Sequence, residues 1–188
     1  MTICIIAGKG DLPKMAIKKL QLENKKFQLI LIEGQEYDED IKQHPHVFFS
    51  FGYVGKFLEF LKNQNISKIV MTGSVKKPSL SELKCDKVGL VLVSKILKKK
   101  IFGDDNSLST IINFFEKRGF KIIGIEEIID DLLASRGILG EVSPNKENIK
   151  DVEIGKDALK ITSNLDLGQS IIVQQKVILA IEGLEGTD

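Results

Sequence analysis

Short apolar runs alternate with longer amphipathic runs over the first two thirds of the chain, and this alternation limits the folds that are available to it. The apolar runs are rich in isoleucine and valine, as buried strands are, and lie at 2–7, 27–32, 47–51, 68–71 and 121–125. The segments between them repeat apolar residues at helical spacing, at 12–22, 56–62, 88–100 and 107–118. This order predicts a parallel sheet with right-handed crossovers, so residues 1–133 are expected to form a Rossmann-like α/β domain.

The pattern changes after residue 133. Residues 134–148 contain two glycines, one proline and many polar residues, which predicts a connecting loop. A helix is expected over 149–161, and a β-hairpin over 170–181 with its turn at Gln174–Lys176. One helix and one hairpin bury little apolar surface, so residues 149–188 are interpreted as the start of an incomplete α+β domain.

Composition excludes several classes of protein. The 27 basic and 26 acidic residues leave a net charge of +1, which argues against a globally basic nucleic-acid-binding protein. The two cysteines, Cys4 and Cys85, have neither zinc-site nor disulfide-framework spacing, which is typical of a reducing cytoplasm. No apolar run approaches the roughly 18–20 residues of a membrane-spanning helix. We therefore expect a cytoplasmic protein whose partners are not nucleic acids.

A glycine-rich turn follows the first predicted strand and opens the first predicted helix. Gly8 and Gly10 would let backbone N–H groups approach a phosphate at the helix N-terminus, with Leu12 and Pro13 in the first turn. Pro13 stands where a dinucleotide fingerprint has its third glycine, although Glu33 occupies a position suited to a ribose-binding acid. Phosphate binding and an unoccupied tight turn both remain open from these residues.

A second loop, Thr72–Pro78, follows the fourth predicted strand, at the sheet edge where α/β proteins bind ligands. Gly73 permits close approach, Ser74 can donate a hydrogen bond to a phosphate and Lys77 can neutralise its charge. The alternative is a solvated loop between a strand and a helix.

Two charged segments also have structural and functional interpretations. Asp104 and Asp105 precede the predicted helix at 107–118, where they can cap it or bind Mg²⁺, which takes carboxylate ligands. Lysines cluster at Lys95 and 98–100, near the end of the helix predicted over 88–100. They either complement the helix dipole or rest on an anionic membrane surface.

Six segments, taken together and in order, resemble the UDP-2,3-diacylglucosamine pyrophosphatases of lipid A biosynthesis, of the type unrelated to metallophosphoesterases. The segments are IAGKGDLP at 6–13, TGSVKKP at 72–78, GDD at 103–105, RGILGEVSP at 136–144, LDLGQSIIV at 165–173 and VILAIEGLEGTD at 177–188. The resemblance implies Mg²⁺-dependent hydrolysis of UDP-2,3-diacylglucosamine to UMP and 2,3-diacylglucosamine 1-phosphate. It also implies two domains that close around this substrate.

The resemblance assigns roles to individual residues. It implies Asp104, Asp105 and Asp188 as catalytic acids, the first two also as magnesium-associated. It implies substrate contacts at Gly8, Gly10, Leu12, Pro13, Gly73, Ser74, Lys77, Pro78, Gln169, Glu182 and Thr187. This chain departs from the family at Lys9, where glycine is usual, and at Lys77, where arginine is common and binds phosphate bidentately.

Family members continue beyond the final Glu185–Asp188 segment, and an acidic residue needed for catalysis is expected there. The resemblance therefore implies a C-terminally truncated chain that is inactive by itself. A non-catalytic nucleotide-sugar-binding module is the alternative function, and a nicotinamide-dependent oxidoreductase is a third, suggested by Gly8, Gly10 and Glu33. Peripheral contact with the inner face of the inner membrane and homo-oligomerisation both remain open.

Overall fold

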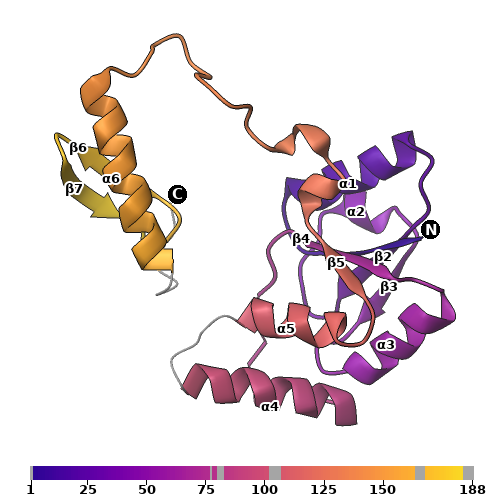
Figure 1. Ribbon diagram of the computed structural model, residues 1–188. Coiled ribbons are helices and arrows are strands. Elements are labelled where there is room, and N and C mark those ends of the chain that lie inside the picture. Colours follow the sequence, from indigo (N-terminus) through magenta and orange to yellow (C-terminus); the bar gives the residue numbers. More distant parts are fainter. Residues whose placement is uncertain (1, 77, 80–82, 102–106, 164–167, 184–188) are drawn as a thin grey trace. The chain divides into compact units, whose positions relative to one another are not determined.

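The chain forms two compact units, Met1–Ala134 (unit 1) and Ser135–Asp188 (unit 2). The structure is a computed structural model that describes residues 2–76, 78–79, 83–101, 107–163 and 168–183 (Figure 1). Within these residues, no helix is long and apolar enough to span a membrane.

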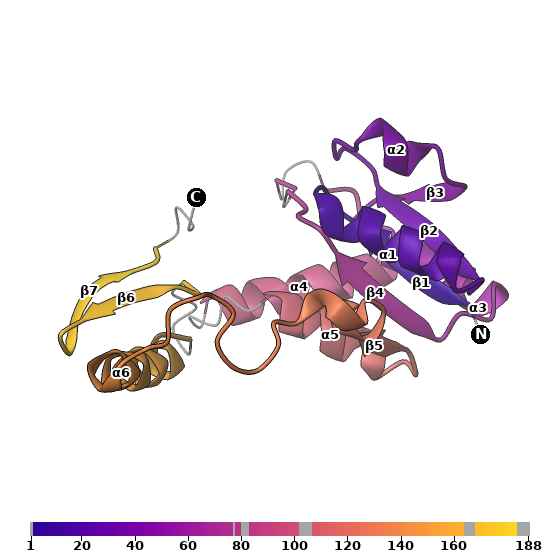
Figure 2. The same cartoon turned by 90° about the horizontal axis from the view of Figure 1, so that it is seen from above.

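Unit 1 is built on a five-stranded parallel sheet in the order β3-β2-β1-β4-β5 (Figure 2). The strands are β1 (Ile3–Ala7), β2 (Phe27–Ile32), β3 (His46–Phe49), β4 (Lys68–Thr72) and β5 (Lys121–Ile123). All five overlap the runs where the sequence predicts strands, with β3 beginning one residue earlier and β4 ending one residue later than predicted. The expected Rossmann-like α/β architecture is confirmed.

Helices cover both faces of this sheet (Figure 1). One face carries α1 (Asp11–Leu22), α2 (Glu39–Lys42) and the short 3-10 helices η1 (Ile125–Glu127) and η2 (Asp130–Leu132). The other face carries α3 (Val54–Asn63), α4 (Lys87–Ile101) and α5 (Ser107–Glu116). The short helices α2, η1 and η2 were not predicted, because one turn is too short for a hydrophobic period to show.

Alternate residues of each central strand enter opposite cores. Ile5 and Leu29 pack under α1, whereas Cys4, Ile30 and their counterparts on β4 pack under α3 and α5. A strand that is buried on both faces has no polar side, which is why these runs are continuously apolar. Full burial of each such side chain contributes roughly 1.5–3 kcal/mol to folding.

Three helices return to the sheet through a residue with positive φ. Asn24 follows α1 with φ of 52°, Asn65 follows α3 with φ of 53°, and Gly119 follows α5 with φ of 86°. In each case the next backbone N–H bonds back into the last helical turn, as from Lys25 to the carbonyl of Leu20 at 2.9 Å. This left-handed cap turns the chain sharply toward the following strand.

One carboxylate caps two helices of unit 1. Asp86 accepts hydrogen bonds from the backbone N–H of Gly89 in α4, at 2.7 Å, and of Lys56 in α3, at 3.1 Å. Its own N–H donates to the carbonyl of Gly52 at 3.0 Å. Asp86 therefore joins the N-termini of helices that lie about thirty residues apart in the sequence.

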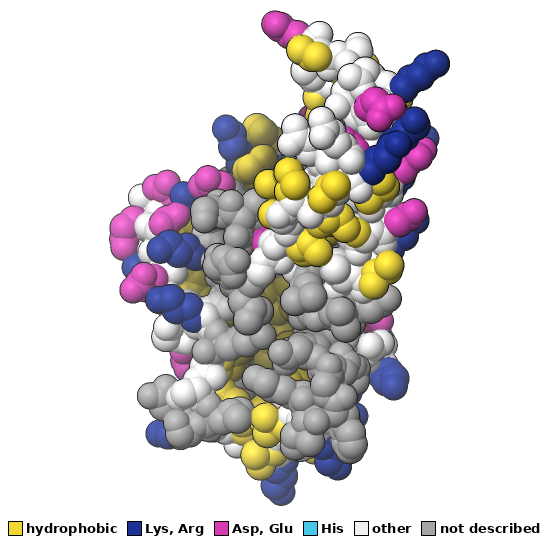
Figure 3. All heavy atoms as spheres, turned by 90° about the vertical axis from the view of Figure 1, so that its left-hand side faces the viewer, with side chains coloured by type: hydrophobic (Ala, Val, Ile, Leu, Met, Phe, Trp, Pro, Cys, Tyr) yellow, Lys and Arg dark blue, Asp and Glu magenta, His cyan; other side chains and the backbone are white. Residues whose placement is uncertain are grey.

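Unit 2 comprises α6 (Lys146–Ser163) and an antiparallel hairpin of β6 (Ile171–Gln174) and β7 (Val177–Ile181). Asn145 and Asn148 cap α6 reciprocally, each side-chain oxygen accepting from the other's backbone N–H, at 2.9 and 3.0 Å. The hairpin turns at Gln175 and Lys176, whose backbone N–H groups donate to Asp151 of α6 at 3.1 and 2.7 Å. The side chains of β7 are exposed, and most of them are aliphatic. Figure 3 shows hydrophobic side chains grouped on the face toward the viewer.

The shared cap at Asp86 yields a test of stability. Asp86→Ala removes an acceptor from two helix N-termini, so we expect the free energy of unfolding to fall by about 1–3 kcal/mol. Asp86→Asn keeps one acceptor oxygen and should lose less. Urea denaturation followed by circular dichroism measures both, with Glu59→Ala on the exposed side of α3 as the control. An equal loss in Glu59→Ala would contradict the capping role.

Candidate functional site

The centre of the sheet contains a topological switch. From β1 the chain builds toward β2 and β3, whereas β4 and β5 extend the sheet on the other side of β1. Open α/β sheets bind ligands at the carboxyl edge beside such a switch. The two glycine loops that the sequence singles out, Gly8–Pro13 and Thr72–Pro78, leave the sheet at this place.

Backbone hydrogen bonds join these two loops. The N–H of Gly8 donates to the carbonyl of Thr72 at 2.7 Å. Lys9 and Ser74 then exchange a pair of bonds, at 2.7 Å from the N–H of Lys9 and 2.9 Å from the N–H of Ser74. The structure thus brings together residues that lie more than sixty positions apart in the sequence.

Glycine is required where the loops touch. A Cβ on Gly73, whose φ is +85°, would lie 2.8 Å from the carbonyl carbon of Gly8, the carbonyl oxygen of Lys9 and the Cγ of Pro13. A Cβ on Gly8 would overlap the carbonyl oxygen of Ser74. Pro13 is buried at this contact, and its ring packs against Gly73 of the second loop. The glycines that suggest a phosphate turn therefore also serve loop packing.

A pocket of about 430 Å³ opens beside the joined loops. It is lined by Lys9, Gly10, Asp11, Leu12, Gly73 and Ser74. Gly10 is the N-cap of α1 and provides no side-chain acceptor, so N–H groups of the first turn lack a side-chain cap. Such N–H groups and the helix dipole favour an anion such as phosphate.

Charges around the pocket differ in how firmly they are paired. Lys14 pairs with Asp38 at 2.6 Å and with Asp11 at 3.3 Å. The bond to Asp38 raises the pKa of Lys14 and lowers that of Asp38. Lys9 is 63% exposed, and its Nζ lies 4.0 Å from Glu36. Lys9 is therefore the cation that can turn toward a bound phosphate, whereas the charge of Asp11 opposes one.

Gln35, which sequence reasoning missed, clamps the second glycine loop. Its side-chain amide donates to the carbonyl of Lys76 at 3.0 Å, and its Oε1 accepts from the N–H of Lys76 at 2.8 Å. Gln35 follows β2, so a third loop at the same sheet edge holds the Thr72–Pro78 loop in place. The sequence holds one signal for this role, the position of Gln35 just after a predicted strand.

Tyr37, also missed, secures the end of β1 from the same third loop. Its buried hydroxyl accepts from the N–H of Ile32 at 2.6 Å and lies 3.2 Å from the carbonyl of Ala7, to which it can donate. Burial raises the pKa of Tyr37. The hydroxyl therefore stays protonated at neutral pH and ties the end of β2 to the residue before Gly8.

Thr72 places a hydroxyl close to the joined loops. Its side chain is 7% exposed, and Thr72 Oγ1 is buried with no hydrogen-bond partner in the part of the chain that the structure describes. Because side chains alternate along a strand, Thr72 shares the face of β4 that Val70 presents to the α1 core. A buried hydroxyl without a partner carries a desolvation cost of about 1–3 kcal/mol.

Two predicted site residues of unit 2 contact each other. The backbone N–H of Gln169 donates to the Glu182 carboxylate at 2.5 Å, and the N–H of Glu182 donates to the carbonyl of Ser170 at 3.0 Å. These bonds close the open end of the β6–β7 hairpin. Glu182 therefore has a structural role in unit 2, and substrate contact by either residue stays a prediction.

The remaining predicted residues divide into two groups. Pro78 lies within the described residues and is exposed. Lys77, Asp104, Asp105, Thr187 and Asp188 lie outside them. Over the described ranges, no group of three or more His, Cys, Asp or Glu side chains is arranged to hold a metal ion.

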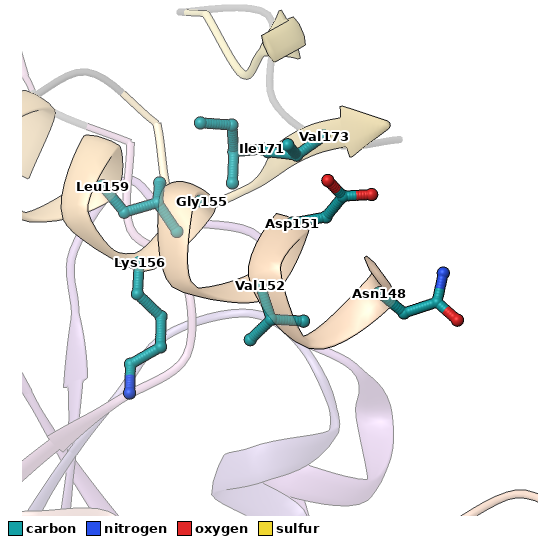
Figure 4. Close-up of a pocket in the computed structure, with 8 residues that line it drawn as sticks. All are labelled: Asn148, Asp151, Val152, Gly155, Lys156, Leu159, Ile171 and Val173. Carbon is teal, nitrogen blue, oxygen red and sulfur yellow. The ribbon is translucent and has the colours of Figure 1, made fainter. Parts of the chain in front are cut away.

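A second pocket, of about 390 Å³, lies in unit 2 between α6 and β6 (Figure 4). Ile171 and Val173 face the helix at Gly155, whereas Lys156 extends away from the strand. Mostly aliphatic groups line it, and Asp151 beside it already binds the hairpin turn. The glycine-loop pocket is the better candidate site, because it combines backbone donors, the exposed cation of Lys9 and the switch in strand order.

Comparison with known proteins gives consistent matches to both units. Residues 2–132 match the family model described as LpxI N-terminal domain, and residues 135–188 match that described as LpxI C-terminal domain. A relative from Caulobacter vibrioides, named UDP-2,3-diacylglucosamine pyrophosphatase LpxI, is 30% identical over 184 residues. The alignment covers 98% of this chain and 65% of the relative, so the chain spans about two thirds of the relative's length.

The clamp from Gln35 can be tested with pyrophosphate as the ligand. Gln35→Ala removes the two hydrogen bonds that hold the Lys76 backbone, so we expect pyrophosphate affinity to fall about tenfold. Calorimetry measures the affinity, and hydrogen exchange at the Lys76 amide should quicken in the same variant. Gln64→Ala, at the end of α3, is the matched control. Unchanged affinity in Gln35→Ala, or an equal loss in Gln64→Ala, would show that the clamp does not shape the site.

Proposed function

Since this chain belongs to the LpxI family, whose N- and C-terminal domain models it matches in order, we propose that it hydrolyses the pyrophosphate of UDP-2,3-diacylglucosamine. The products would be UMP and 2,3-diacylglucosamine 1-phosphate, in lipid A biosynthesis. The name of the Caulobacter relative supports the substrate and the reaction. The observation that carries the proposal is the pair of joined glycine loops beside the first turn of α1.

In this proposal the glycine loops hold one phosphate of the substrate. Backbone N–H groups at the start of α1 donate to its oxygens, and Gly73 keeps the approach open. The Ser74 hydroxyl donates a further bond, and Lys9 neutralises charge as the phosphorus is attacked by water. Pyrophosphate cleavage depends mainly on positioning and charge neutralisation, which these groups provide. Lys77 and Pro78 would extend the contact toward the nucleotide or sugar.

We also propose that Asp104 and Asp105 associate with Mg²⁺, and that Asp188 is a further catalytic acid. Paired carboxylates are hard oxygen ligands that suit Mg²⁺, which commonly takes one or two of them together with substrate phosphate. Bound Mg²⁺ would neutralise charge on the pyrophosphate and the leaving phosphate. Gln169, Glu182 and Thr187 would contact substrate from unit 2.

A non-catalytic nucleotide-sugar-binding module is the second candidate. It is favoured by one observation: the described residues that line the glycine-loop pocket provide phosphate donors, and the one carboxylate among them, Asp11, is paired with Lys14 rather than free to activate a water molecule. Both candidates place the protein in the cytoplasm with a UDP-linked ligand. The hydrolase additionally needs contact with a membrane surface, because a diacylated substrate partitions into lipid.

Ligand binding tests both candidates. At ligand concentrations about tenfold above Kd, UDP and UMP should raise the melting temperature of residues 1–188 by about 4 °C, whereas NAD should not. We also propose that residues 1–188 release UMP from UDP-2,3-diacylglucosamine far more slowly than the Caulobacter relative does. The side chains of β7 are exposed, so unit 2 is not packed on that side, and hydrolysis of a pyrophosphate requires the reacting groups to be held in precise positions. Release of radiolabelled UMP measures this.

Each outcome has a distinct meaning. UMP release at a rate comparable to that of the relative would support the hydrolase and overturn the proposed inactivity of residues 1–188. Selective stabilisation by NAD would contradict both UDP-based proposals. UDP binding without UMP release, in a chain of the relative's full length as well, would favour the binding module.

The proposed Mg²⁺ ligands have their own test. We expect Mg²⁺ to tighten UDP binding by wild-type residues 1–188. The double variant Asp104→Asn with Asp105→Asn should abolish that effect, while its melting temperature should stay within about 2 °C of the wild-type value. Calorimetry with and without Mg²⁺ measures the coupling, and Asp131→Asn is the matched control. If only the melting temperature falls, these carboxylates act as a helix cap.

A further inference from the structure

Helix α4 is unusually basic. Its fifteen residues include five lysines and no acidic residue. The three helices on its side of the sheet, α3, α4 and α5, carry seven lysines and two glutamates, a net charge of +5, whereas the whole chain has +1. Positive charge is therefore concentrated on one side of unit 1.

The orientation of α4 is set by its packing. Leu92 is buried, and Val88 and Ile96 pack against the same core, so these residues define the inner side of the helix. In unit 1, α4 contacts α3 and α5 and lies farthest from the sheet (Figure 1). The opposite side of α4 therefore points away from the core and cannot rotate inward without losing these contacts.

That outer side combines exposed apolar and basic residues. Leu90 is 59% exposed and Val91 is 47% exposed. Around them, at helical spacing, stand the exposed residues Lys87, Lys95 and Lys98. We name these five residues the α4 face.

Folding alone accounts for only part of this arrangement. The helix dipole favours a lysine in the last turn, which covers Lys98 but neither Lys87 at the start nor Lys95. A single exposed leucine is ordinary on a protein surface, but here two neighbouring aliphatic residues lie among lysines with no acid on the helix. An anionic lipid surface complements both features, since headgroups attract lysines and the interface accepts short aliphatic side chains.

We propose that the α4 face docks unit 1 onto an anionic lipid bilayer. The inference deepens the proposed function, because a hydrolase of a diacylated substrate must work at the surface where that substrate resides. Each lysine close to such a surface strengthens the attraction to anionic headgroups, so the exposed lysines of the α4 face support reversible association. Leu90 and Val91 enter the interface between them.

Vesicle sedimentation with residues 1–188 tests the docking surface without any turnover. Wild type should sediment with vesicles of phosphatidylglycerol and phosphatidylcholine, not with phosphatidylcholine alone, and should be released when ionic strength rises to about 0.5 M. Lys95→Gln with Lys98→Gln should weaken binding about thirtyfold. Leu90→Ser with Val91→Ser should weaken it about tenfold.

The matched control changes the same charge elsewhere. Lys18→Gln with Lys26→Gln removes two exposed lysines away from the α4 face, and we expect less than a twofold effect. Melting temperatures of all variants verify folding. Equal losses in the control pair, or no preference of the wild type for anionic vesicles, would overturn the proposal.

Three further outcomes are decisive. Sedimentation velocity without vesicles measures the oligomeric state. If the wild type is a dimer, and the double variant Leu90→Ser with Val91→Ser is a monomer, a second copy covers the α4 face and lipid docking is wrong. If a chain of the relative's length binds vesicles but does not release UMP, the proposed function is wrong and the docking surface is still supported. If that chain releases UMP from detergent-solubilised substrate but does not bind vesicles, the proposed function is supported and the docking surface is wrong.

Discussion

The candidate site depends on the backbone contact between the loops that follow β1 and β4. Three hydrogen bonds, among Gly8, Lys9, Thr72 and Ser74, join loops that the chain makes far apart in sequence. The contact is close enough that Gly8 and Gly73 have no room for a side chain. Because backbone atoms occupy the contact, N–H groups at the start of α1 lie beside an open pocket. A phosphate site at this edge depends first on these positioned backbone N–H groups, and charged side chains add to the binding.

The loop after β2 stabilises this contact from one side. Gln35 binds the backbone of Lys76, and the Tyr37 hydroxyl joins the ends of β1 and β2. Both use neutral groups, so they hold the loops without adding charge to the pocket that we propose binds phosphate. The charged residues serve a different purpose: Asp38 occupies Lys14, while Lys9 stays largely exposed. Neutral contacts that hold the loops, together with one exposed cation, suit the phosphate binding that we propose for this pocket.

The two faces of the sheet have different consequences for function. The core under α1 supports the glycine loops, since Ala7 and Tyr37 belong to it. The core under α3, α4 and α5 orients the basic α4 face outward, and Asp86 ties α3 to α4. Ligand pocket and proposed lipid contact are thus supported by separate sets of side chains within one domain. Changes on the α4 face are accordingly expected to leave the glycine loops intact.

Much of the fold could be predicted from the sequence, because local patterns encode it. A strand buried on both faces must be apolar throughout, as in Leu29–Ile32, and helices such as α5 repeat apolar residues at a 3.6-residue period. The Gly8–Pro13 and Thr72–Pro78 loops were also predicted, since strand ends and glycines mark them. By contrast, α2, the clamp from Gln35, the Tyr37 junction and the shared cap at Asp86 were decided by the tertiary structure. Each joins residues about thirty to forty positions apart or leaves no periodic trace, and a hydrogen bond between distant segments exists only once the sheet has brought them together.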